Sequence, residues 1–189
     1  MMPDEHTCEM NTPAKCVAAI AILVAASCGP AHAQARRNAD SFAAMTVAQL
    51  KTGIEKQHPA AFYVLAKKLF EQGERDEAVF WFYAGQLRYR AYLSGHPQLP
   101  RDGDPALFAS LSEVVGKPIN VYAFGDIPAL AKTIDRVLAW DVSQPDAFNK
   151  APEREQSRNG LSGMKAHVEA TADEIRATRT KNGLENRGK

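Results

Sequence analysis

Residues 77–90 read EAVFWFYAGQLRYR, and this stretch decides the fold because four consecutive aromatic residues stand at positions 80–83. Consecutive residues of an α-helix point about 100° apart, so these rings cannot form one flat patch. The helix is apolar around most of its circumference, which is typical of a helix packed between neighbours. Gly85 lacks a side chain and lets another helix approach closely. We therefore predict a central core helix over residues 77–93, with a partly exposed aromatic groove as the alternative.

Turn residues and apolar spacing predict further helices on both sides of this core helix. Residues 41–54 carry a loose helical pattern, and residues 60–72 form a helix that begins beside Pro59 and ends at Gly73.

The segment after the core helix opens with helix-start chemistry. Asp104 is a good N-cap residue, Pro105 fits the first helical position, and Gly116 followed by Pro118 predicts the end of the helix. Residues 119–124, INVYAF, fit either a short strand or a helical turn, and we favour the helical turn because no partner strand is evident.

The C-terminal part predicts two helices and a tail. Asp126 caps a helix that runs to about residue 141, and residues 153–182 form one long surface helix. Its narrow apolar stripe consists of Leu161, Met164, Val168, Ala172 and Ile175. The expected fold is therefore all-α, a single compact domain of five or six helices over residues 41–182. We expect a flexible tail at residues 34–40 and a disordered one at residues 183–189.

The N-terminal residues have the three parts of a secretory signal. Lys15 supplies the positive charge, residues 16–27 form an apolar run, and Ala-His-Ala at positions 31–33 is a small-x-small cleavage pattern. We predict that residues 1–33 are a signal peptide. Met10 is the better start, because the acidic residues that precede it suit a signal poorly.

This leader determines the predicted location. Cleavage after Ala33 makes the mature chain periplasmic or secreted, whereas lipidation at Cys28 or retention of the leader would anchor it to a membrane. Cys8 and Cys16 also lie in the leader, so we expect no disulfide and no cysteine nucleophile in the mature chain. No later stretch is apolar for long enough to predict a transmembrane segment.

Residues 62–90 place large and small side chains as a helical hairpin does, at Phe62, Leu65, Ala66, Leu69, Gly73, Ala78, Phe82 and Gly85. These positions resemble a single tetratricopeptide or Sel1-type hairpin, which implies two antiparallel helices and a protein-binding role. Arg75 replaces the usual aromatic turn residue, and no second copy follows, so a generic helical hairpin stays open as the alternative. Residues 77–141 also resemble small exported bacterial proteins.

Composition and spacing argue against several classes of function. The net charge of +1 is not that of a nucleic-acid binder. His58, His96 and His167 lack the spacing of a helical zinc site, so we expect no metal and no cofactor. Residues 101–104, RDGD, lack the further ligands of a calcium loop and predict a turn with a helix cap.

Five residues are candidates for binding: Arg88, Tyr89, Tyr92, His96 and Asp102. The first three alternate charge and aromatic rings, as single-strand binders do, but a helix places them on different faces. We expect the arginine side chains to lie along the surface of the core helix. Tyr92, His96 and Asp102 could also line the cleft of a hydrolase, although no GxSxG elbow or oxyanion loop is present.

Two functions therefore remain as hypotheses. The first is an exported module of the bacterial cell envelope that binds another protein without catalysis, as an immunity or adaptor protein does. The alternative is a periplasmic hydrolase whose active site is assembled from residues distant in sequence.

Overall fold

The computed structural model describes residues 40–188, and these form helices and no strand, which confirms the all-α class. The predicted signal peptide, the lipidation site and residues 34–39 of the predicted tail lie outside the described residues, whereas residue 40 begins a short helical turn. In chain order the α-helices are α2 (Val47–Lys51), α3 (Ala60–Glu71), α4 (Arg75–Gly95), α5 (Asp104–Leu111), α6 (Lys117–Ala123), α7 (Ile127–Ser143), α8 (Ala151–Ala170) and α9 (Ala172–Lys181).

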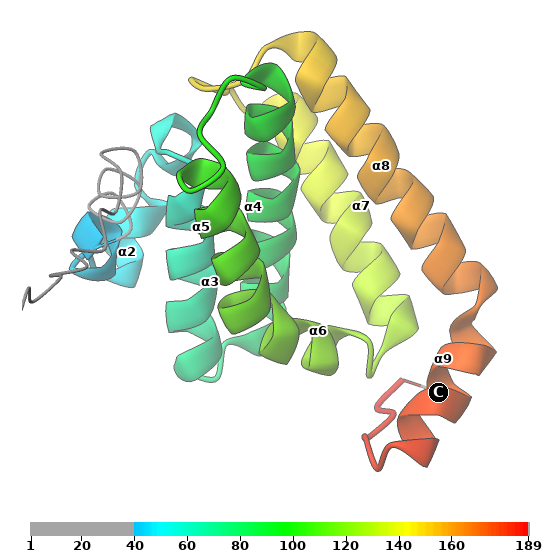
Figure 1. Ribbon diagram of the computed structural model, residues 1–189. Helices are drawn as coiled ribbons and strands as arrows, with labels where there is room; N and C mark the ends of the chain where they lie inside the picture. The colour runs from blue at the N-terminus through cyan, green and yellow to red at the C-terminus, as the bar shows by residue number, and fades with distance from the viewer. Residues whose placement is uncertain (1–39, 189) are drawn as a thin grey trace, which may run out of the picture.

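The aromatic helix α4 stands at the centre, with α3 and α5 on one side and α7 and α8 on the other (Figure 1). Phe82 and Tyr83 are at most 2 % exposed, and Phe80 is 8 % exposed. The prediction of a core helix is therefore confirmed. α3 and α4 form an antiparallel hairpin, and Gly73 makes its turn with a φ of 89°, a left-handed conformation that favours glycine.

Two glycines let large side chains approach the helices closely. A Cβ atom on Gly85 would lie 2.7 Å from Phe62 Cβ, so α3 and α4 could not keep their separation. A Cβ atom on Gly116 would lie 2.7 Å from the ring of Phe82. A side chain at either position would overlap its neighbours, so close packing requires glycine there.

The predicted helix end at Gly116 and Pro118 is wrong. A π-helical turn, Ser112–Gly116, joins α5 directly to α6, and Pro118 lies in the first turn of α6. Proline has no N–H to bond the preceding turn, and the wider π turn lies immediately before it. Residues 119–123 are helical, as we favoured, and residue 124 caps the helix.

The prediction of a single long C-terminal helix is also wrong, because the helix breaks at Thr171 into α8 and α9. Thr171 has φ −107° and ψ 19°, and its hydroxyl donates to the His167 carbonyl at 2.8 Å. A threonine hydroxyl that bonds the preceding turn bends helices. The predicted stripe still packs against the core, since Leu161 and Val168 are buried and Ile175 is half-buried.

Residues 184–188 lie against the protein, in contrast to the disordered tail that we predicted. The Arg187 amide donates to the Gly125 carbonyl at 2.6 Å, and its guanidinium donates to the Tyr122 carbonyl at 2.6 Å. The same guanidinium lies 3.5 Å from the centre of the Tyr122 ring. Backbone bonds and a cation–π contact thus hold the tail at the α6–α7 turn.

The single helix that the pattern over residues 41–54 predicts is divided into short pieces, a helical run at residues 40–43, α2, and a 3-10 helix at Ile54–Lys56. α2 covers only Val47–Lys51, where Thr46 and Gln49 form a capping box. The predicted cap of α7 is confirmed, because Asp126 accepts a bond of 3.0 Å from the Ala129 amide.

A buried cluster of ions joins α4 to α7 and to the loop that follows it. Arg88 on α4 is 2 % exposed, and Asp141 on α7 is fully buried. Arg88 Nε lies 2.6 Å from Asp141 Oδ1, and Arg88 Nη1 lies 2.8 Å from Asp146 Oδ2. Burial lowers the pKa of Arg88, and the two carboxylates act in the opposite direction. The expectation that its side chain lies along the helix surface is therefore wrong for Arg88.

Two arginines of α8 complete this ion cluster. Arg158 Nη1 lies 2.8 Å and Arg154 Nη2 lies 3.3 Å from Asp141 Oδ2. Arg154 also donates to the Asp141 carbonyl and, at 3.1 Å, to the Gln144 carbonyl at the end of α7. The negative end of the helix dipole lies there, so this helix end offsets the excess of arginines over aspartates.

We expect Gly85→Ala to lower the free energy of unfolding by about 1–3 kcal/mol, because the added methyl group overlaps Phe62. Urea denaturation followed by circular dichroism measures the change. Gly160→Ala is the control, since nothing lies within 4 Å of a Cβ atom there. That change should raise stability by about 0.5–1 kcal/mol by removing a helix-interior glycine. A Gly85→Ala protein as stable as the wild type would contradict the close approach of α3 and α4.

We expect Asp141→Asn to lower the free energy of unfolding by about 3–5 kcal/mol, because it leaves buried arginines without their carboxylate. Asp135→Asn is a matched control, because Asp135 also joins α7 to α8, through Lys165 at 2.6 Å, but its side chain is 57 % exposed. Loss of the Asp135–Lys165 ion pair should lower the free energy of unfolding by no more than about 1 kcal/mol. Equal costs for the two variants would show that the ion cluster is not what holds α8 in place.

Candidate functional site

The structure does not bring the five predicted binding residues to one surface. Arg88 and Tyr89 are at most 2 % exposed and lie inside the protein. Tyr92 and His96 are half-buried, and Asp102 is exposed in the loop before α5. Tyr92 and His96 pack on each other with ring centres 4.5 Å apart. The predicted site is therefore divided between the interior and the surface.

Tyr89 belongs to a buried polar group around Asp104. The Tyr89 hydroxyl donates to Asp104 Oδ1 at 2.7 Å, and His58 Nε2 lies 3.2 Å from the same oxygen. His58 Nδ1 accepts the Ala60 amide at 3.3 Å, which places the ring proton of a neutral His58 on Nε2, toward Asp104. The predicted N-cap role of Asp104 is wrong: Gly103 is the N-cap residue, and the carboxylate serves His58 and Tyr89 instead.

These contacts affect ionisation. Burial opposes the charged form of Asp104, but the bonds from His58 and Tyr89 outweigh it and hold the Asp104 pKa below its ordinary value of 3.8. Burial, reinforced by the Asp104 carboxylate, raises the pKa of Tyr89 well above its ordinary range. Tyr89 thus stays a neutral donor, and this group stabilises the start of α5.

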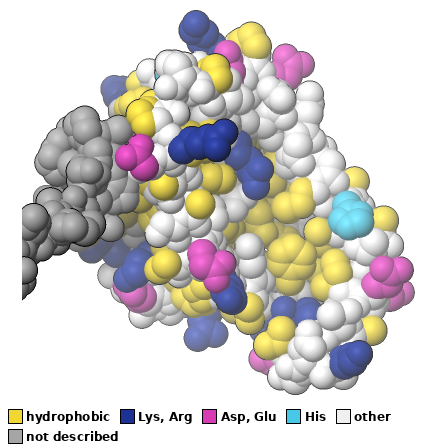
Figure 2. Space-filling model, viewed as in Figure 1, with side chains coloured by type: hydrophobic (Ala, Val, Ile, Leu, Met, Phe, Trp, Pro, Cys, Tyr) yellow, Lys and Arg dark blue, Asp and Glu magenta, His cyan; other side chains and the backbone are white. Residues whose placement is uncertain are grey.

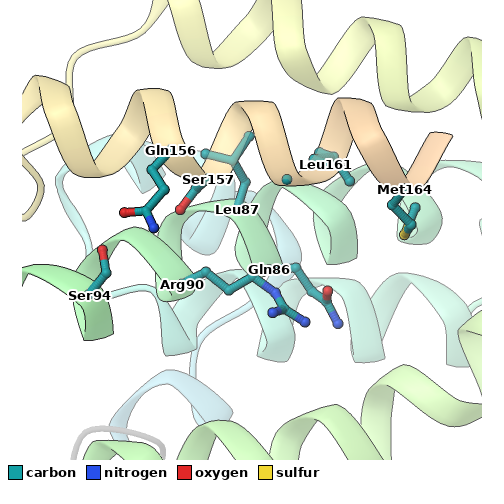
Figure 3. Close-up of a pocket in the computed structure, with 9 residues that line it drawn as sticks. Gln86, Leu87, Arg90, Ser94, Gln156, Ser157, Leu161 and Met164 are labelled. Carbon is teal, nitrogen blue, oxygen red and sulfur yellow. The ribbon is translucent and has the colours of Figure 1, made fainter. Parts of the chain in front are cut away.

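A cavity of about 380 Å³ lies between α4 and α8 (Figure 3). α4 contributes Gln86, Leu87, Arg90 and Ser94, which follow one side of the helix. α8 contributes Gln156, Ser157, Gly160, Leu161 and Met164. Arg90 is the one charged residue among the nine that line the cavity. The cavity therefore combines an apolar wall with hydrogen-bonding side chains and a single cation.

A second, shallower groove of about 550 Å³ lies between α6 and α9. Its apolar residues are Val121, Phe124, Ile175 and Leu184, with Val121 42 % exposed and Leu184 37 % exposed. Polar residues also line it, namely Asn120, His167, Thr171, Glu174, Thr178, Arg179 and Asn182. Figure 2 shows apolar side chains gathered in a hollow on this face of the molecule. We call this feature the α6–α9 groove.

Within residues 40–188, no group of three or more His, Asp or Glu side chains is placed to hold a metal ion. No helix in the same range is both long and apolar enough to cross a membrane. The lining of the two hollows offers apolar contact and hydrogen bonds.

Sequence reasoning missed the cavity, although part of its signal is visible. Gln86, Arg90 and Ser94 recur every four residues along α4, which marks one polar face. Leu161 and Met164 belong to the predicted stripe of the C-terminal helix. No local pattern indicates that the polar face of α4 meets this stripe, because that pairing is a tertiary contact.

Comparison with known proteins gives a partial match. An "Uncharacterized protein" of Haemophilus influenzae is 33 % identical over 90 residues, which are 46 % of this chain and 34 % of that protein. The chain thus spans about a third of the length of this relative. No family model and no solved structure matches the chain. The functional argument therefore depends on the geometry of the two hollows.

We expect the stabilising effect of Asp104 to depend on pH. Because folding lowers its pKa, the effect is fully present above the ordinary value of 3.8 and is lost as the pH falls through the lower folded value. The difference in unfolding free energy between wild type and Asp104→Asn should be largest above about pH 5 and shrink in stronger acid. Urea denaturation across this range measures it.

Tyr89→Phe provides the internal comparison, because it removes one of the two donors to Asp104. We expect this variant to show part of the same pH-dependent loss. A difference between wild type and Asp104→Asn that stays constant into strong acid would contradict the assigned role of the two donors.

Proposed function

We propose that this chain is an exported protein-interaction module of the bacterial cell envelope, without catalytic activity, of the immunity or adaptor type. Its partner is another protein, which docks in the α6–α9 groove. The observation that carries the proposal is the exposed apolar surface of this groove.

The groove has the composition of a protein-docking surface. Val121 is 42 % exposed on α6 and faces a hollow that also contains Phe124 and Ile175. Adjacent apolar residues that stay exposed mark interaction sites in soluble proteins. His167, Glu174 and other polar side chains surround them, as the polar rim of an interface surrounds its apolar centre.

Two features of the sequence support the same proposal. The predicted leader directs the chain out of the cytoplasm, where a partner in the envelope would be found. The hairpin of residues 62–90 resembles units of repeat proteins that bind other proteins. The hydrolase alternative receives no comparable support, because Tyr92, His96 and Asp102 line neither of the two hollows.

We expect Val121→Glu to lower recovery of the partner by about tenfold or more, because a charge buried in an apolar interface without a counter-ion is strongly unfavourable. The measurement is affinity capture of the tagged protein from an envelope extract of its source, quantified by mass spectrometry. Val142→Glu is a matched control, since Val142 is a 71 % exposed valine near the end of α7, outside the groove.

The same partner, recovered with wild type and Val142→Glu and lost with Val121→Glu, would support the proposal. Equal recovery with all three proteins would place the partner elsewhere on the surface. Failure of the wild type to recover any stoichiometric partner would count against an interaction function.

A further inference from the structure

The cavity between α4 and α8 has the size and lining of a small-molecule site. Its volume of about 380 Å³ lies within the range of ligand pockets, roughly 300–1,000 Å³. None of its lining residues belongs to the α6–α9 groove, so the cavity is a candidate site separate from the protein-docking surface.

The charge in the cavity is a cation without a carboxylate. Among residues 40–188, no Asp or Glu lies within ion-pair distance of the Arg90 guanidinium, which is positioned instead 5.6 Å from the centre of the Phe108 ring. Three other arginines of α4 and α8 differ, since Arg88, Arg154 and Arg158 all contact Asp141. Arg90 is therefore available to pair with an anion from outside the described residues.

A second donor lies beside this cation. Gln86 stands one turn before Arg90 on α4, and Figure 3 shows its amide next to the Arg90 guanidinium. A carboxylate matches this arrangement, because a guanidinium donates two parallel N–H bonds to its two oxygens and an amide can add a third.

Apolar side chains from both helices form another part of the cavity wall, Leu87 from α4 and Leu161 and Met164 from α8. Leu87 and Leu161 are at most 8 % exposed, and Met164 is half-buried. Gly160 adds no side chain, and nothing lies within 4 Å of a Cβ atom built there, so the wall stays open at this point. Methionine adapts its shape to varied apolar groups. This wall favours a hydrocarbon chain over a strongly polar ligand.

We propose that the cavity between α4 and α8 binds a small apolar carboxylate. The carboxylate pairs with Arg90 and Gln86, and the hydrocarbon part lies against Leu87, Leu161 and Met164. This binding function goes beyond the proposed protein docking and does not depend on it.

Octanoate and octanol are the probes, because they share a hydrocarbon chain and differ in the charged group. Titration of the purified protein, followed by amide chemical shifts in NMR spectra, gives both the affinity and the location. We expect octanoate to shift the amide resonances of residues 86–94 and 156–164. Octanol should bind about tenfold more weakly, since it lacks the charge-assisted bonds.

Three variants test the assignment. Arg90→Gln changes an exposed residue. It should weaken the affinity for octanoate about tenfold and leave the affinity for octanol unchanged. Gly160→Trp should fill the cavity and abolish binding of both probes. Gly163→Trp is its matched control, because Gly163 is equally open on the same helix but does not line the cavity.

Equal binding of the two probes would overturn the carboxylate assignment, and so would an octanoate affinity that Arg90→Gln leaves unchanged. Shifts confined to other parts of the protein, or no shift at all, would overturn the site itself. N-acetyl-leucine, titrated in the same way, distinguishes the source of the group. Tighter binding than octanoate indicates the C-terminal residue of a peptide, and weaker binding indicates an acyl chain.

Discussion

The rest of the structure depends on the burial of one guanidinium, that of Arg88. A charge in the interior is stable only if it is paired and hydrogen-bonded. Arg88 pairs with Asp141 and Asp146, and its Nη1 donates to the Pro145 carbonyl at 3.0 Å. The two aspartates belong to the end of α7 and the loop after it, so pairing them with α4 fixes where α7 ends. Arg154 and Arg158 then fix the start of α8 against the same carboxylates. The position of α8, and with it the cavity beside α4, follows from this ion cluster.

The two hollows arise because α8 and α9 cover the core incompletely. α8 touches α4 through a narrow stripe in which only Leu161 and Val168 are buried. A helix with so narrow an apolar face, and with a glycine at position 160, cannot fill the space over the polar side of α4. The break at Thr171 then allows α9 to begin a new direction beside α6, where the α6–α9 groove forms. The same departures from a straight, well-covered helix thus give the molecule its candidate binding surfaces.

The polar residues that resemble a site in the sequence mostly satisfy one another in the interior. Arg88 pairs with aspartates, and Tyr89 and His58 share Asp104. Buried polar groups need such partners, so a sequence rich in Arg, Tyr and Asp around a core helix is as compatible with internal pairing as with binding. Arg90 is two residues from Arg88 and therefore points in another direction, where no described carboxylate lies within ion-pair distance. This difference of direction, and not the residue type, separates a structural arginine from a candidate binding one.

The sequence alone determined the helical class, the core role of residues 80–83, the α3–α4 hairpin with its turn at Gly73, and the cap at Asp126. Each depends on local chemistry or on the period of a single helix. It did not determine that α5 continues through a π turn into α6, that the last helix breaks at Thr171, or that Asp104 serves His58 and Tyr89 in place of capping. The break depends on the Thr171 hydroxyl bonding the His167 carbonyl, which the apolar stripe that continues to Ile175 does not indicate. The other two depend on tertiary partners, since Phe82 packs against Gly116 and Tyr89 donates to Asp104. The candidate cavity belongs to the same class, since it exists only where two helices that are about 60 residues apart in sequence lie side by side.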